Sequence, residues 1–152
     1  MEALNIRKMK YAIVVIITTM TALSACTLET SHNGKLDGMW QLTQLDTLAT
    51  EGQTDMRETG IFWSVQSNLL KVAALYGGAE PVLFRFQHTG AQLVISDPYI
   101  DNRSEGDIKI EDTAELSFYN IDALEQTFSV EQLTSGKMTL QSERFRFHFR
   151  KY

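Results

Sequence analysis

Cysteine, proline and long apolar runs are nearly missing from this chain of 152 residues. Cys26 is the only cysteine, so no disulfide can form within the chain and the stability of the fold must come from its core. There are two prolines and no internal repeat or low-complexity tract, which indicates one folded globular domain. Gly-x-Ser-x-Gly, the Walker loop, HExxH and CxxC do not occur, and we therefore expect no enzyme activity.

Positive charge is also scarce. The chain has 14 basic and 19 acidic residues, and without residues 1–25 the counts are 11 and 18, a net charge of -7. A nucleic-acid-binding surface would be basic, so no nucleic-acid partner is expected. His32, His88 and His148 are scattered without metal-ligand spacing, and no metal or cofactor is predicted.

The N-terminal residues have the composition of a secretory signal peptide. Arg7, Lys8 and Lys10 precede the uncharged run Tyr11 to Leu23, which has 13 residues. A membrane-spanning helix needs about 20 apolar residues, so this run is too short to be a permanent span. Its length and basic flank are typical of a signal-peptide apolar region.

The end of that run, Leu23-Ser24-Ala25-Cys26, resembles the lipobox of bacterial lipoproteins. The resemblance implies cleavage before Cys26, attachment of a diacylglycerol to its thiol and of a fatty acid such as palmitate to the new amino terminus, and anchoring of the mature protein to a membrane. It divides the chain into a signal peptide (residues 1–25), a lipidated tether (26–35) and a folded domain (36–152). Thr27 stands where an aspartate would favour the inner membrane, which implies the outer membrane of the cell envelope. The alternative is a buried structural cysteine after an ordinary cleavage site.

The folded domain is predicted to be all-β. Residues 81–87 and 91–97 flank a His-Thr-Gly turn, and residues 127–133 and 137–142 flank Thr-Ser-Gly, so each pair predicts a hairpin. In residues 143–152, three phenylalanines alternate strictly with basic residues, which is the strongest strand pattern in the chain. One short helix is expected near residues 121–126. About eight strands with short turns predict a small antiparallel barrel or sandwich, and closure into a barrel would pair the apolar last strand.

From about residue 36 to residue 152, the chain resembles the lipocalin-like lipoproteins of gut anaerobic bacteria. The resemblance rests on Gly38-Met39-Trp40, the run "IFWSVQSNLL" and the closing "RFRFHFRKY". It implies a small antiparallel barrel of the calycin type, with Arg146 or Arg150 packed over Trp40 to close one end. It also implies a protein that binds or carries a small hydrophobic molecule.

Aromatic residues are the candidate lining of such a ligand site. Trp63, Phe84, Phe86 and Phe147 would surround an apolar molecule if the barrel is hollow. If the barrel is filled by its own side chains, the same residues are core. The protein would then be an accessory or interaction component of an envelope complex with no ligand, and its protein partner is not specified by the sequence.

Three weaker patterns remain. Arg144, Arg146, His148 and Arg150 form either a solvated outer face or a site for an anionic group, and the solvated face is the preferred interpretation. Residues 101–112 have the acidic spacing of a calcium loop, but Arg103 occupies a ligand position, so a solvated loop is expected. Thr47 and Thr113 lie in Asp-Thr-apolar tripeptides that resemble the O-glycosylation signal of exported proteins in the same bacterial group.

Overall fold

The computed structural model describes residues 31–152. Cys26 and the predicted signal peptide lie outside the described residues. Three short 3-10 helices and ten strands make up the domain: η1 (Gly34–Leu36), β1 (Gly38–Thr47), β2 (Gly52–Asp55), η2 (Arg57–Thr59), β3 (Ile61–Gln66), β4 (Leu69–Ala74), β5 (Val82–His88), β6 (Gln92–Ile100), β7 (Ile108–Lys109), η3 (Thr113–Tyr119), β8 (Gln126–Leu133), β9 (Lys137–Gln141) and β10 (Phe145–Lys151).

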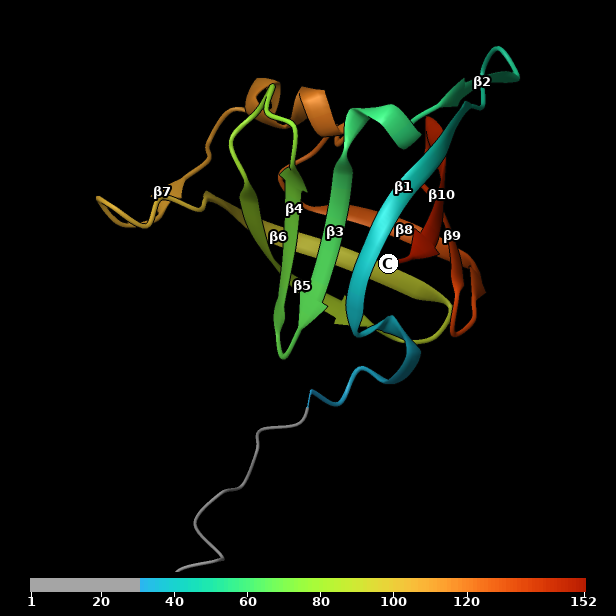
Figure 1. Ribbon diagram of the computed structural model, residues 1–152, viewed down its shortest axis with the longest axis horizontal. Coiled ribbons are helices and arrows are strands. Elements are labelled where there is room, and N and C mark those ends of the chain that lie inside the picture. Colours follow the sequence, from blue (N-terminus) through green and yellow to red (C-terminus); the bar gives the residue numbers. More distant parts are fainter. Residues whose placement is uncertain (1–30) are drawn as a thin grey trace, which may run out of the picture. The chain divides into compact units, whose positions relative to one another are not determined.

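Eight of these strands close into an antiparallel barrel (Figure 1). Their order is β10-β9-β8-β6-β5-β4-β3-β1, and the pairing of β1 with β10 closes the ring. The two short strands, β2 and β7, are additions on β1 and β6. The predicted all-β barrel of about eight strands is therefore confirmed.

The hairpins follow the predicted turns. β5 pairs with β6, and β8 pairs with β9. In the second hairpin the Thr134 hydroxyl accepts hydrogen bonds from the backbone N–H groups of Gly136 and Lys137, which fixes the turn. The run of residues 60–75 folds into a third hairpin, β3 and β4, whose turn contains Ser67 at a positive φ of 56°.

The predicted helix near residues 121–126 is wrong in position. The helix is η3, which begins earlier because the Asp112 carboxylate accepts a hydrogen bond from the Ala114 N–H, at 2.9 Å. It ends at Asn120, whose φ is 58°. Ile121 is then buried in the core, and the Asp122 N–H donates to the Gln126 side chain instead of to a helical carbonyl.

The core occupies the interior of the barrel. Trp40, Trp63, Phe84, Phe128 and Phe147 are all 0% exposed, and apolar residues from every barrel strand pack in the same core. None of the helices within residues 31–152 has the length and apolar character needed to cross a lipid bilayer.

Candidate functional site

Strand β10 separates the interior of the barrel from its outer wall. Phe147 and Phe149 are buried, whereas Arg146, His148 and Arg150 are half-buried or exposed. Successive side chains of a strand point to opposite faces, so the odd-numbered residues face the core and the even-numbered ones face solvent. The basic row therefore lies on the outer wall, as the preferred interpretation predicted.

The interior is filled by aromatic rings in mutual contact. The Trp63 ring centroid lies 5.1 Å from that of Phe149, 5.6 Å from Phe128 and 6.0 Å from Phe147. Phe128 and Phe147 meet edge to face at 5.6 Å. These spacings are those of packed aromatic pairs, so the four rings form one packed cluster inside the barrel.

The predicted ligand-lining residues are all in or against this core. Trp63, Phe84 and Phe147 are fully buried, and Phe86 is half-buried and packs against the core. Their placement fits both alternatives left by the sequence, and a role in lining a ligand stays a prediction. What they do in this structure is to pack.

One end of the barrel is closed by Trp40. Its indole Nε1 donates a hydrogen bond to the Leu36 carbonyl oxygen at 2.8 Å. The Lys151 ammonium lies 4.8 Å from the centre of the Trp40 ring system, within the range of a cation-π contact. Gly38, at a φ of +112°, permits this arrangement, because a Cβ there would lie 2.9 Å from Lys151 Cε.

The prediction that Arg146 or Arg150 packs over Trp40 is wrong. Strand register places Lys151 opposite Trp40, whereas both arginines are at even-numbered positions, whose side chains lie on the outer face. Arg150 Nε instead donates to the Gln41 side-chain oxygen at 2.8 Å, on the outside of the barrel.

The opposite end of the barrel is covered by η3 (Figure 1). Leu116 and Tyr119 of this helix are fully buried, and the Tyr119 hydroxyl donates to the Glu80 carbonyl oxygen at 2.8 Å. Burial raises the pKa of the Tyr119 hydroxyl, so it remains a hydrogen-bond donor at neutral pH. This helical cover was not predicted from the sequence, although Asp112 and Glu115 have the spacing of a helix capping box.

Two buried side-chain donors, the Trp63 indole Nε1 and the Gln126 Nε2, have no partner among the described residues, and the buried His88 ring Nε2 has none either. Gln126 uses its oxygen to accept from the Asp122 N–H at 2.8 Å. Buried polar groups are nearly always paired with protein, water or ligand, so each of these donors has an unused hydrogen bond.

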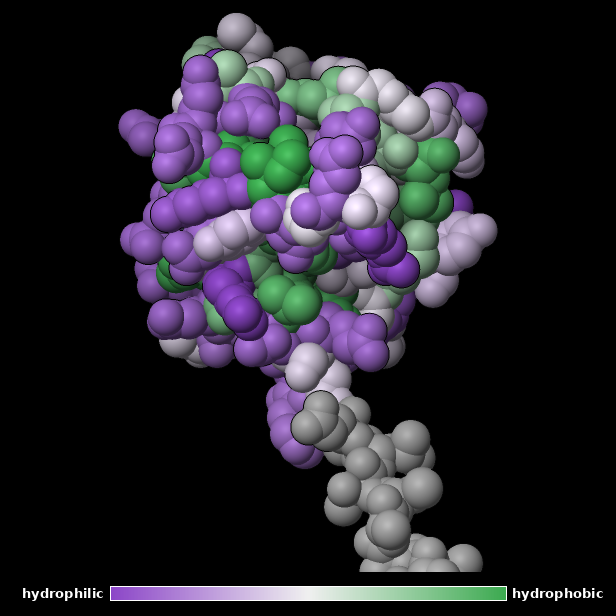
Figure 2. All heavy atoms as spheres, turned by 90° about the vertical axis from the view of Figure 1, so that its left-hand side faces the viewer, coloured by the Kyte–Doolittle hydropathy of each residue, from purple (hydrophilic) through white to green (hydrophobic). Residues whose placement is uncertain are grey.

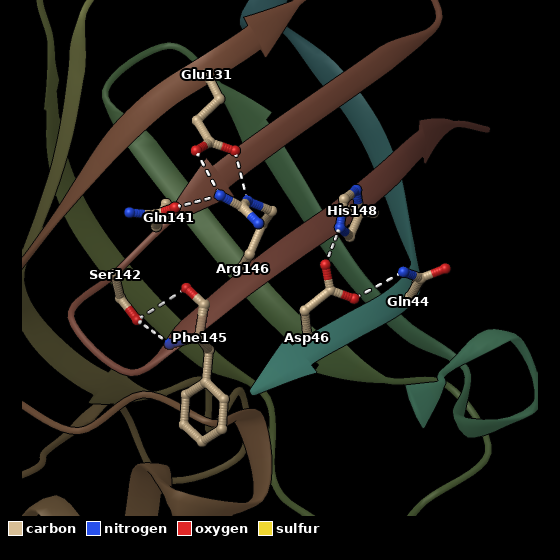
Figure 3. A network of polar contacts seen from close by, with 8 residues as sticks. All are labelled: Gln44, Asp46, Glu131, Gln141, Ser142, Phe145, Arg146 and His148. Atoms are coloured by element: carbon tan, nitrogen blue, oxygen red, sulfur yellow. Dashed lines mark hydrogen bonds and ion pairs between the residues drawn. The ribbon is translucent and has the colours of Figure 1, made fainter. Parts of the chain in front are cut away.

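The outer wall carries a polar network around β10 (Figure 3). Arg146 makes a two-pronged contact with Glu131, at 2.7 and 3.0 Å, and also donates to the Gln141 side chain. These contacts span β8, β9 and β10. They hold the guanidinium against the wall, and the hydrogen bonds to Glu131 raise the pKa of Arg146.

A second part of the network joins β10 to β1. His148 Nε2 lies 2.8 Å from Asp46 Oδ2, and Gln44 Nε2 donates to Asp46 Oδ1 at 2.6 Å (Figure 3). Burial raises the pKa of the Asp46 carboxyl, but the hydrogen bonds from Gln44 and His148 and the nearby positive charges outweigh it. The net effect is a lowered pKa, and Asp46 is ionised at neutral pH.

Next to this network lies a surface groove of about 720 Å³, which we call the outer groove. It lies across the outside of β1, β9 and β10, and it is bordered by β2 and η2 at one side and by β8 at the other. Its lining includes Gln44, Gln53, Arg57, Lys137 and Arg150. No single stretch of sequence predicts the groove, because its residues come from positions 43–57 and 132–150.

The two predicted glycosylation sites and the calcium-like loop do not form a common site with the residues described above. Thr113 is exposed at the start of η3 and Thr47 is half-buried at the end of β1, so their glycosylation stays a prediction. Asp101, from the calcium-like loop, is engaged by Lys71 and by Arg103. Within residues 31–152, no group of three His, Cys, Asp or Glu side chains is arranged to hold a metal ion.

Two solved structures are similar to this chain, and the first of them supports the barrel fold. A solved lipocalin-like protein from Bacteroides uniformis is 22% identical, with a TM-score of 0.60, over 78% of this chain and 100% of that chain. An uncharacterized protein from Bacteroides eggerthii is 25% identical, with a TM-score of 0.49, over 76% of this chain and 98% of that one. No curated protein matches the chain.

The family comparison covers most of the sequence. Residues 21–152 match the model of the lipocalin-like domain, and the Bacteroides uniformis structure shares the fold along its whole length. The chain therefore belongs to the lipocalin-like domain family.

Proposed function

We propose that this protein is a lipid-anchored binding protein of the bacterial cell envelope, with a packed barrel interior and a binding surface on its outer wall. Lipocalin-like proteins are generally binding or carrier proteins, and the fold supports the binding of small molecules. The observation that carries the proposal is the contact of Trp63 with three other aromatic rings in the barrel interior. An apolar ligand there would have to displace these rings.

The anchor is supported by the N-terminal sequence. A basic segment, a 13-residue apolar run and the lipobox-like Leu23-Ser24-Ala25-Cys26 occur in the order that export and acylation require. Several acyl chains on Cys26 would give stable attachment to a membrane, which a single chain would not.

The described residues nearest to Cys26 are fixed at the Trp40 end of the barrel. The Asn33 side chain donates to the Ser67 carbonyl oxygen and to the Asp37 carboxylate, both at 2.7 Å. Ser31 is the fifth residue after Cys26, and an extended chain of that length spans at most about 18 Å. An acylated Cys26 would thus keep the Trp40 end near the membrane and leave the outer wall accessible from the side.

Metabolic labelling tests the anchor. The full-length protein, produced in its own host with radioactive palmitate, should carry the label, sediment with membranes and lose both properties in Cys26→Ser. A Cys26→Ser variant that is still cleaved and still sediments with membranes in high salt would contradict anchoring through this residue.

Binding of an apolar probe tests the packed interior. We expect a fluorescent probe such as 1-aminoanthracene to show no saturable binding to the detergent-extracted protein. Saturable binding at one site per chain, competed by fatty acids, would overturn the packed interior.

A second candidate is a carrier of a small apolar molecule, and the unpaired donors favour it. The Trp63 Nε1 and Gln126 Nε2 groups would each gain a partner if a ligand placed an acceptor oxygen beside them. Under this alternative Trp63→Phe, which keeps an aromatic ring and removes the donor, should weaken binding of the probe. If the interior is packed, no binding exists to weaken, and the same variant changes only stability.

A further inference from the structure

The outer groove concentrates positive charge on an acidic protein. Arg57, Lys137 and Arg150 contribute three positive charges to its lining, and Asp55 contributes one negative charge. Asp55 is held by the Arg57 guanidinium, whose hydrogen bonds lower the pKa of the Asp55 carboxyl to about 2. The groove is therefore positively charged at neutral pH, although the whole chain has a net charge of -5.

The charge is distributed unevenly between the two sides of the barrel. Residues 97–125 contain nine acidic and two basic residues, whereas residues 132–152 contain five basic and one acidic residue. Figure 2 shows the side of the molecule with β6 and β7, where hydrophilic residues cover most of the surface. An anion would be repelled from the acidic segment and drawn toward the β9 and β10 side.

Two of the cations in the groove are available to a ligand. Within residues 31–152, neither Lys137 nor Arg150 has an ion-pair partner, since the salt bridges formed there use other residues. Arg150 is exposed and its Nε is oriented by the neutral Gln41 side chain. Its remaining guanidinium N–H groups can donate to a carboxylate or phosphate.

The rest of the lining has the chemistry that recognises hydroxyl groups. Gln53 and Gln132 provide amides, and Thr139 provides a hydroxyl. Thr43 and Gln44 keep acceptor oxygens, because the Thr43 hydroxyl donates to the His148 carbonyl oxygen and Gln44 Nε2 donates to Asp46. Amides and hydroxyls both donate and accept, as the hydroxyls of a sugar do. The volume of 720 Å³ lies in the range of about 300–1,000 Å³ that is typical of small-ligand sites.

The groove offers little exposed apolar side-chain surface to an acyl chain, because its two apolar lining residues, Met138 and Phe149, are buried. The large exposed apolar residues within residues 31–152 are Leu69, Leu75, Tyr76, Ile108, Phe118 and Tyr152, and none of them lines the groove. A site for an anionic phospholipid would need apolar surface beside the cations. This difference favours a sugar-borne anion over a lipid headgroup.

We propose that the outer groove binds an acidic oligosaccharide, with its carboxylate or phosphate on Arg150 and Lys137 and its hydroxyls on the glutamine and threonine side chains. This inference rests on the proposed function only in placing the partner on the outer wall. Because the probe experiment above concerns the interior, the two proposals fail separately.

The test is binding of the detergent-extracted full-length protein to an array of carboxylated and phosphorylated oligosaccharides with their neutral counterparts. We expect binding to acidic members only, weakened by added salt because exposed charges are screened. The double variant Lys137→Gln and Arg150→Gln should lose about tenfold or more in affinity, since it removes two charge-assisted contacts.

A matched control removes the same charges elsewhere. Arg103→Gln with Lys109→Gln alters two exposed cations on the β6 and β7 side and should leave affinity within about twofold. Melting temperatures of both double variants show whether each is folded. An equal loss in both variants, an absence of binding to every acidic member, or preferential binding to anionic phospholipid vesicles would each overturn the proposal.

Discussion

The two faces of strand β10 differ in almost every physical property. On the inner face, Phe147 and Phe149 are nearly free of solvent contact and pack ring against ring with Trp63. On the outer face, Arg146 and His148 are joined to acidic and amide side chains of the neighbouring strands. One residue along the chain is enough to pass from one environment to the other.

The comparison shows how one strand can serve two purposes. The inner face stabilises the barrel by burying apolar area, and packing is the main constraint on which side chains fit there. The outer face contributes little to stability because its ion pairs are partly solvated, and its residues are free to serve recognition. We therefore expect substitutions on the inner face to change folding and substitutions on the outer face to change binding.

The largest expected effect comes from emptying the inner face. Phe147→Ala should lower the free energy of unfolding by about 3–5 kcal/mol, because it removes a fully buried ring and leaves a cavity among other rings. Urea denaturation measures the change. Arg146→Ala, the neighbour on the outer face, should cost less than about 1 kcal/mol. Similar costs for the two variants would remove the distinction between the faces.

The closed end of the barrel should be the next most sensitive place. Gly38→Ala should cost about 1–3 kcal/mol, because its φ of +112° is unfavourable for any residue with a Cβ, and Lys151 would have to withdraw from Trp40. Gly136→Ala is the control, since a Cβ there meets nothing within 4 Å. An unchanged denaturation midpoint for Gly38→Ala would show that the backbone at this end is not constrained as described.

A smaller effect is expected from the cation over Trp40. Lys151→Met keeps the apolar stem and removes the charge, and it should cost about 0.5–1 kcal/mol through the lost cation-π contact. The Trp emission spectrum should also change. Arg150→Met, on the opposite face, should leave the emission as it is in the wild type. If only the Arg150 variant changes Trp emission, the assignment of Lys151 as the closing residue is wrong.

The smallest effect concerns Asp46 on the outer wall. Its pKa is lowered in the folded protein, so its contribution to stability is complete above the unfolded pKa of about 3.9 and is lost as pH falls through the lower folded value. Asp46→Asn should therefore lower the free energy of unfolding by less than about 1 kcal/mol at pH 7. This difference from the wild type should disappear in strong acid, where Asp46 is protonated. Parallel stability curves for variant and wild type between pH 7 and pH 2 would contradict this coupling.

Much of the fold could be predicted from local patterns. The alternation of Phe145, Phe147 and Phe149 with basic residues predicts both the strand and its two faces, because side chains in a strand alternate with a period of two. The turns around Gly90 and Gly136 predict the hairpins in the same way. Closure of the barrel followed from the need to pair an apolar last strand.

Other features depend on contacts between distant parts of the chain. The register of β10 against β1 determines that Lys151, and not Arg146 or Arg150, packs over Trp40. Composition does not reveal that register. The position of η3 had a local signal in Asp112 and Glu115, which the prediction of a helix near residues 121–126 did not use. The outer groove has no local signal, since β1, β9 and β10 must first be brought together.

The measurement that tests the central claim most directly is native mass spectrometry of the protein purified from the membranes of its own host, followed by denaturing lipid extraction. A packed interior predicts a mass equal to that of the acylated chain alone, with no small apolar molecule released on denaturation. A stoichiometric apolar molecule, retained in the native state and released on unfolding, would contradict the packed interior and establish the carrier instead.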